Sequence, residues 1–187
     1  MVIPGMDKYN FYLPPPAGVH ELNLSDAWRA RWFDASELPG GEPVVYGYAA
    51  VYCDEKGYVT RLSGTEPWGI AEGPLEPGEK PLAWAKRAAL QQVGASVGVV
   101  ELMGYLECRA TTHNPDFAAG AVTIRPLYMV VAKSVKDIGK SSGYERRRLP
   151  LNEFGVAIRN RYPEIVDYVV KTLDRYVILT RTGQLEL

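Results

Sequence analysis

The sequence predicts an α/β domain in which helices pack on a β-sheet. Strand-like runs and segments with helical periodicity are interspersed along the chain, an order typical of this class. The length of 187 residues suits one domain with room for a hydrophobic core. Hydrophobic residues make up 47 % of the chain and charged residues 23 %, which is ordinary for a folded globular protein.

Residues 1–40 differ from the rest and are expected to form an N-terminal arm rich in aromatic residues and proline. Three consecutive prolines at 14–16 fix φ and remove backbone donors, so they predict an extended segment. Further on, Ser25 is expected to cap a short helix on which Trp28 and Trp32 share one face. The arm either covers an edge of its own domain or makes a homodimer contact, and the sequence leaves both open.

The domain over residues 41–187 begins with a predicted β-hairpin. Residues 44–52 are rich in valine and tyrosine, and residues 58–62 form a second β-rich run. Between them, residues 54–57 read Asp-Glu-Lys-Gly, which is turn chemistry. A loop rich in glycine and proline follows over residues 64–78.

A helix is predicted from residue 79 to residue 93, because its apolar positions recur on one face and Gly94 supplies a stop. The residues of that face are Leu82, Ala85, Ala89 and Val93.

Two long strands are predicted next, over residues 97–108 and 123–133, joined by a loop over residues 110–121. A short edge strand is expected at 144–149. A final amphipathic helix is expected at 163–180, with proline in its first turn.

Charge and hydropathy exclude several classes of protein. Lysine and arginine number 21 against 22 acidic residues, a net charge of −1, which argues against binding nucleic acid by bulk charge. No apolar run approaches the roughly 20 residues that span a bilayer, and no signal peptide is visible, so a cytoplasmic protein without a membrane partner is expected. Cys53 and Cys108 lack close-spaced ligand partners and are predicted to be small buried hydrophobes.

The most informative spacing lies between residues 68 and 95. Gly73 is followed six positions later by Glu79, and Glu79 eight positions later by Arg87; Gly94 then precedes an apolar residue. This register, G-x5-E-x7-R and a closing G-U with U apolar, resembles the signature of the Nudix family, hydrolases of nucleoside diphosphates linked to another moiety. The resemblance implies an α/β/α sandwich with a mixed β-sheet.

The departures from the signature fall where its metal-binding glutamates stand. In the family, three glutamates just after the arginine hold a divalent metal against the substrate's diphosphate. Here the three places are Ala88, Gln91 and Gln92, and all are neutral. The family often has a proline and a glycine just before the first glycine of the signature, and here Ala71 and Glu72 stand in their places. Because magnesium prefers carboxylate oxygen, the substitutions predict loss of the usual metal-dependent hydrolysis.

We therefore expect a degenerate Nudix box that is non-catalytic or weakly active and binds a nucleotide-diphosphate-type small molecule, with no metal or other cofactor. The candidate ligand-binding residues are Glu72, Arg87, Gln91, Gln92 and Arg109. Arg87 is expected to orient the box loop by pairing with Glu79 or Glu76. Trp84 is expected to fill the space of the metal and water or to pack against the arm.

Two alternatives stay open. In one, the protein is an active hydrolase that holds magnesium or manganese through substitute acids, with Glu76, Glu79 and Glu107 as the candidates. Glu101 and Glu107 are predicted to share one face of their strand, because alternate residues point the same way. In the other, the protein is a homodimeric interaction protein without a small ligand, built through Trp28 and Trp32.

Overall fold

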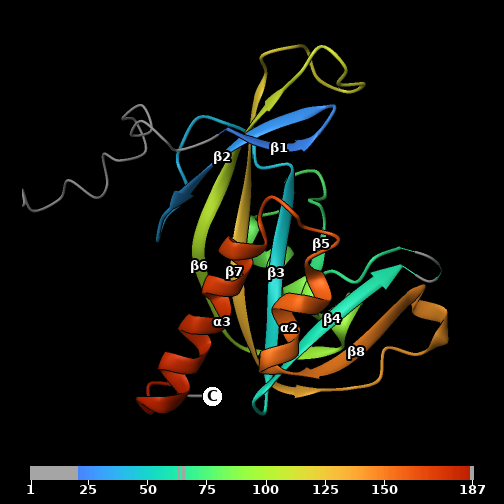
Figure 1. Cartoon of the computed structure of the whole chain (residues 1–187), viewed down its shortest axis with the longest axis vertical. Helices are drawn as coiled ribbons and strands as arrows, with labels where there is room; N and C mark the ends of the chain where they lie inside the picture. The colour runs from blue at the N-terminus through green and yellow to red at the C-terminus, as the bar shows by residue number, and fades with distance from the viewer. Residues whose placement is uncertain (1–20, 63, 65, 186–187) are drawn as a thin grey trace, which may run out of the picture.

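The computed structural model describes residues 21–62, 64 and 66–185, so the prolines at 14–16 lie outside the described residues (Figure 1). The strands are β1 Leu22–Ser25, β2 Trp28–Asp34, β3 Tyr46–Cys53, β4 Lys56–Leu62, β5 Ala71–Pro74, β6 Ala95–Ala110, β7 Val122–Val135 and β8 Tyr144–Pro150. The α-helices are α1 Pro81–Ala88, α2 Leu151–Ile158 and α3 Val166–Arg181; a π-helical turn, Ala89–Val93, continues α1, and a 3-10 turn, Lys140–Ser142, precedes β8.

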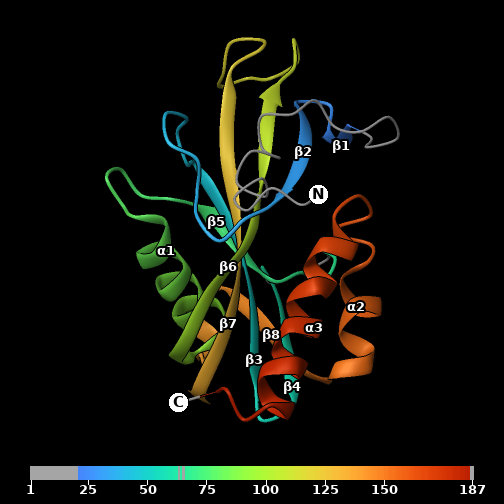
Figure 2. The ribbon, with the colours of Figure 1, turned by 90° about the vertical axis from the view of Figure 1, so that its left-hand side faces the viewer.

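Within the described residues, all eight strands belong to one mixed sheet. Its order is β1-β2-β6-β7-β3-β4-β8, with β5 paired to β3 outside that path. Strands β3 and β7 run parallel, and the other named pairs are antiparallel. Figure 2 shows the sheet edge-on, with α1 on one face and α2 and α3 on the other. The predicted layered α/β arrangement is confirmed.

Apolar side chains fill both faces of the sheet. One cluster packs α1 against β3 and β7 through residues such as Trp84, Ala88 and Val130. The larger cluster lies under α2 and α3 and includes Tyr52 and Phe154. Both cysteines are buried and unpaired, as the sequence predicts.

The predicted hairpin is confirmed as β3 and β4. Cys53 pairs with Lys56, so only Asp54 and Glu55 form the connection. Both have positive φ, 49° and 56°, which is the conformation of a tight turn between twisted strands. The predicted edge strand is confirmed as β8, which pairs with β4 at the end of the sheet.

The helix predicted over 79–93 is confirmed, although it starts two residues later, at Pro81. Its last turn is π-helical and ends at Gly94, whose φ of 80° suits a residue without a Cβ. A Cβ at Gly94 would lie 2.2 Å from the carbonyl oxygen of Lys136, so close packing also requires glycine.

The short helix predicted around Trp28 and Trp32 is wrong: these residues lie in β2, which pairs with β6 over its whole length. A spacing of four residues places side chains on one face in a strand as well as in a helix, so the spacing could not distinguish them. Trp32 stacks on Tyr168 of α3 with ring centroids 4.7 Å apart. The β1–β2 hairpin thus extends the sheet; the predicted boundary between residues 40 and 41 stays a prediction.

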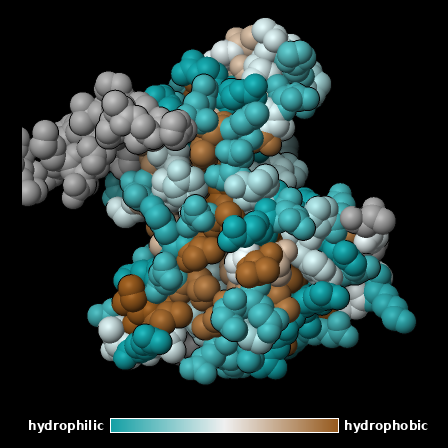
Figure 3. Space-filling view, in the orientation of Figure 1, coloured by the Kyte–Doolittle hydropathy of each residue, from teal (hydrophilic) through white to brown (hydrophobic). Residues whose placement is uncertain are grey.

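The sequence missed α2, whose eight residues directly follow β8. The last predicted helix is confirmed as α3, starting at Val166. On the face that α2 and α3 cover, Figure 3 shows hydrophobic side chains gathered over these helices, and Val156 and Ile178 are among the exposed ones. None of the helices among the described residues has the length and apolar character needed to cross a membrane.

Candidate functional site

Arg87 fastens the box loop to α1. Its Nε and Nη2 atoms each donate to the Glu79 carboxylate at 2.7 Å, and Glu79 also accepts from the backbone N–H of Glu76 at 2.9 Å. Hydrogen bonding from Arg87 lowers the pKa of Glu79 to about 2. The predicted pairing of Arg87 with Glu79 is confirmed, and both carboxylate oxygens of Glu79 accept hydrogen bonds.

Gln92 holds the π-helical turn against β5. Its side chain is buried; Oε1 accepts from the backbone N–H of Glu72 at 3.2 Å, and Nε2 donates to the carbonyl of Glu72 at 2.7 Å. The amide acts as a neighbouring strand would, offering one acceptor and one donor to the same residue. A carboxylate could not make the second bond, because it has no hydrogen to donate.

The other two box positions are also used internally. Ala88 is buried in the core on the α1 face of the sheet. Gln91 is exposed and accepts a hydrogen bond from Arg87 Nη1 at 3.2 Å. Trp84 lies one helical turn before Ala88. It is buried against β3, where a Cβ at Gly47 would lie 2.4 Å from its ring. Trp84 therefore packs in the core beneath β3.

These residues do not fit a divalent cation. The three box positions supply no carboxylate, and the amide of Gln92 is committed to the backbone of Glu72. Across the described part of the chain, no group of three or more histidine, cysteine, aspartate or glutamate side chains is placed to hold a metal ion. Magnesium and manganese require several oxygen ligands, carboxylates above all, that converge on one point.

The prediction that Glu101 and Glu107 share a face is wrong. Glu101 pairs with Arg175 of α3 at 2.8 Å, whereas Leu106 beside Glu107 belongs to the core on that same face. A break in the β6–β7 register between residues 102 and 104 shifts the alternation, so Glu107 points to the opposite face. There it pairs with Arg31 of β2 at 2.6 Å.

Glu72 enters a cluster with the segment that joins α2 to α3. Its carboxylate accepts hydrogen bonds from Arg161 Nε, from Arg161 Nη2, and from the Tyr162 hydroxyl at 2.7 Å. Arg161 also pairs with Glu66 at 3.1 Å. The charge of Glu72 is thus neutralised by Arg161, and burial raises the pKa of the Tyr162 phenol well above its usual value.

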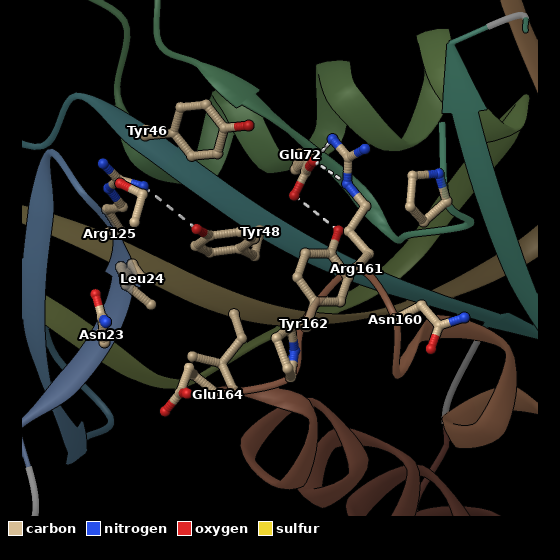
Figure 4. A pocket seen from close by; sticks show the side chains of 14 residues that line it. Asn23, Leu24, Tyr46, Tyr48, Glu72, Arg125, Asn160, Arg161, Tyr162 and Glu164 are labelled. Atoms are coloured by element: carbon tan, nitrogen blue, oxygen red, sulfur yellow. Dashed lines mark hydrogen bonds and ion pairs between the residues drawn. The ribbon is translucent and has the colours of Figure 1, made fainter. Parts of the chain in front are cut away.

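A cavity of about 390 Å³ opens beside this cluster. Figure 4 shows its walls: β1 on one side, β3 and β7 behind, and the α2–α3 segment opposite. Its lining residues include Asn23, Tyr46, Tyr48, Glu72, Arg125, Asn160 and Arg161. Burial raises the pKa of Tyr48 to about 12, so its hydroxyl stays protonated at neutral pH. The cavity therefore combines aromatic surface with hydrogen-bond donors and cationic groups.

Arg125 is the guanidinium on the wall formed by β7. It lies between two rings, with its Cζ atom 4.9 Å from the centroid of Trp28 and 5.1 Å from that of Tyr46. Its Nη1 atom donates to the Tyr48 hydroxyl at 3.4 Å, and its Nε atom is buried without a hydrogen-bond partner among the described residues. A guanidinium that lines a cavity and makes no ion pair with a carboxylate of the described residues suits an anionic ligand.

The structure separates the residues that the sequence singled out. Glu72 lines the cavity of about 390 Å³, and with Gln92 it lines a smaller one of about 180 Å³. Gln91 lines a third hollow of about 640 Å³ at the end of the π-helical turn. Arg87 and Arg109 line none of these three cavities.

Sequence reasoning missed Arg125 and the α2–α3 segment. Arg125 carried a usable signal, since it is a charge within the apolar strand run over residues 123–133. Such a residue is rarely buried without a partner or a function. Arg161 and Tyr162 gave no comparable signal, because only the fold brings them 89 and 90 residues back to Glu72.

Known proteins resemble this chain in structure and not in sequence. No family model and no curated protein matches the sequence. The Bacillus subtilis pyrophosphohydrolase BsRppH superposes with a TM-score of 0.53 and 13 % identity, over 65 % of this chain and 72 % of its own. A NUDIX hydrolase from Nitrosomonas europaea (19 % identity, 62 % and 78 % coverage, TM-score 0.45) and the C. elegans Ap4A hydrolase (12 %, 72 % and 98 %, 0.46) also match. The likeness to the Bacillus protein shows the fold alone.

Proposed function

We propose that this chain, which has a Nudix fold, binds a nucleotide-type ligand and does not carry out metal-dependent hydrolysis at its box. One observation carries the proposal: the polar side chains of the box are bonded within the protein, while a cavity lined by aromatic and cationic groups lies open beside β5. A nucleoside carrying a diphosphate is the ligand class that the resemblance implies.

The cavity has the character of a small-molecule site. Its volume of about 390 Å³ lies within the range of roughly 300–1,000 Å³ typical of ligand pockets. Tyr46 and Tyr48 offer ring surface and hydroxyl donors, and Arg125 offers a positive charge. These are the groups that a base, a ribose and a phosphate would contact.

Two of the three acids that a hydrolase would use, Glu79 and Glu107, are engaged in ion pairs elsewhere. Glu79 is held by Arg87, and Glu107 by Arg31 on β2. Glu76 is largely exposed, with its carboxylate 3.9 Å from Arg87. A metal site needs several ligands converging on one point, so this arrangement favours binding over hydrolysis.

Binding is tested by calorimetry and thermal shift with nucleoside mono- and diphosphates and ADP-ribose, once in EDTA and once in magnesium. A ligand present at 100 times its dissociation constant stabilises the fold by about 2.7 kcal/mol. For a chain of this size we expect a rise in melting temperature of about 5–10 °C, with or without magnesium. If no ligand of the panel raises the melting temperature, the binding proposal fails.

Hydrolysis is tested with the same ligands in magnesium or manganese. No turnover above background is expected. Turnover that persists in the exposed control Glu37→Gln and is lost in Glu79→Gln would overturn the proposal and establish a hydrolase with substitute acids.

A further inference from the structure

We propose that Arg125 binds a single phosphate group in this cavity. The β1–β2 hairpin completes the site, because its Trp28, together with Tyr46 of β3, holds the guanidinium of Arg125 in place. The ligand class that fits this anchor is a phosphate monoester, such as a nucleoside monophosphate, bound without metal. The inference rests on the proposed nucleotide binding and adds which residue recognises the phosphate and which positions it.

The first step is the charge balance of the cavity wall. Two arginines line it, Arg125 and Arg161. Arg161 is compensated by Glu72 and Glu66. Arg125 makes no ion pair with any carboxylate of the described residues. One arginine of the cavity therefore carries an uncompensated charge.

The second step is the way that charge is held. The ring centroids of Trp28 and Tyr46 lie 4.9 Å and 5.1 Å from Arg125 Cζ, inside the limit of about 6 Å for attraction between a cation and an aromatic face. Trp28 is supported in turn by Phe117 of the β6–β7 loop, with ring centroids 5.3 Å apart. Because Nε is buried without a partner, the guanidinium is already partly removed from water. An anion that reaches it loses less to competition with solvent.

The third step is the ligand's charge. A planar guanidinium presents two parallel N–H groups that match the oxygens of one phosphate. A second phosphate would need a second cation, and the neighbouring arginine is already paired with Glu72. In metal-dependent sites a divalent ion supplies that charge, but the box positions do not fit one here. A monophosphate therefore gains as much as a diphosphate.

The test compares four nucleosides (adenosine, guanosine, cytidine and uridine) with their 5′-monophosphates and 5′-diphosphates by calorimetry in EDTA. For the best-bound base, the monophosphate should bind about 10- to 100-fold more tightly than the nucleoside, as a charge-assisted hydrogen-bonded contact predicts. The diphosphate should stay within about fivefold of the monophosphate, because an unpaired exposed charge adds little. Inorganic phosphate should compete with the monophosphate and not with the nucleoside.

Variants assign the roles. Arg125→Gln should lose the 10- to 100-fold advantage of the monophosphate and bind the nucleoside as before, while the exposed control Arg181→Gln changes neither. Trp28→Leu should lose part of the advantage, and Trp28→Phe, which keeps a ring beside the guanidinium, should restore it. A merely structural role of Trp28 would lower the melting temperature and leave the ratio of the two affinities unchanged.

The outcomes separate the two proposals. If no nucleoside or nucleotide binds, nucleotide binding itself is overturned. If nucleotides bind but Arg125→Gln keeps the full advantage of the monophosphate over the nucleoside, only the phosphate anchor is overturned. The same holds if the diphosphate binds the wild-type chain more than about tenfold more tightly than the monophosphate. If Arg125→Gln does not fold, competition by inorganic phosphate on the wild-type chain decides: phosphate that fails to displace the monophosphate overturns the anchor.

Discussion

Replacing Gln92 by glutamate would return one carboxylate to the box, and the structure predicts that the change damages the protein. In the wild type, Gln92 Nε2 donates to the carbonyl of Glu72 at 2.7 Å, and the side chain is buried. A carboxylate in that place faces the carbonyl oxygen without a hydrogen between them. The bond from the Glu72 N–H to the other oxygen survives.

The magnitude follows from the groups left behind. Loss of the hydrogen bond costs about 0.5–1.5 kcal/mol, and a buried carboxylate that faces the carbonyl of Glu72 without a donor between them adds about 1–3 kcal/mol. We therefore expect Gln92→Glu to lower the free energy of unfolding by about 2–4 kcal/mol at pH 7. For a chain of this length, the melting temperature falls by about 4–16 °C.

The loss depends on pH. Burial beside a carbonyl raises the folded-state pKa of the introduced carboxyl above its unfolded value of about 4.3. The stability that its protonated form contributes is therefore present at low pH and is lost as pH rises through the raised pKa. The gap in melting temperature between variant and wild type should be larger at pH 8 than at pH 5.

Urea unfolding and thermal melts at both pH values measure the effect, with Gln91→Glu as the matched control. Gln91 is exposed and accepts from Arg87, which a carboxylate would also do, so its variant should stay within about 0.5 kcal/mol of the wild type. A Gln92→Glu variant as stable as the wild type at pH 7, or one that gains magnesium affinity, would refute this account of the box.

Three other outcomes are expected. Because Arg87 lowers the pKa of Glu79 to about 2, their pairing stabilises the fold above the ordinary carboxyl pKa and fades as pH falls toward 2. Glu79→Gln should therefore destabilise the protein at pH 7 and much less at pH 3, measured by urea unfolding; an equal loss at both values would contradict the pairing. Gly47→Ala would place a Cβ 2.4 Å from Trp84 and should cost about 1–3 kcal/mol, whereas Gly40→Ala, which meets nothing within 4 Å, should be neutral. EDTA and magnesium should leave the melting temperature of the ligand-free protein unchanged, and a magnesium-dependent rise would reveal a metal site.

Local patterns predicted most elements because each carried its own period or stop. The turn at Asp54 and Glu55 and the stop at Gly94 are backbone properties of single residues, and they hold in the fold. The segment around Trp28 and Trp32 failed for the opposite reason. Its spacing fits both periods, and pairing with β6, far away in the sequence, decided for a strand.

The candidate site divides in the same way. Residue identity alone predicts that the box lacks carboxylates at positions 88, 91 and 92, because no fold can turn alanine or glutamine into an anion. The face of Glu107 was not predicted correctly from the alternation of residues. A local break in the register of β6 between residues 102 and 104 reverses the alternation, and Gly104, whose φ is 154°, is the residue in the sequence that could have indicated this break.

By itself the sequence determined the α/β class, the box register and the neutral character of the box, since these depend on residue identity and short-range spacing. Only the tertiary structure decided what that neutral box does: Gln92 completes the hydrogen bonding of Glu72, and the Glu72 carboxylate is claimed by Arg161. It also decided that Arg125 is held beside a cavity between rings from β2 and β3. Contacts between segments this distant depend on how the strands pair, and residue types alone do not specify that pairing.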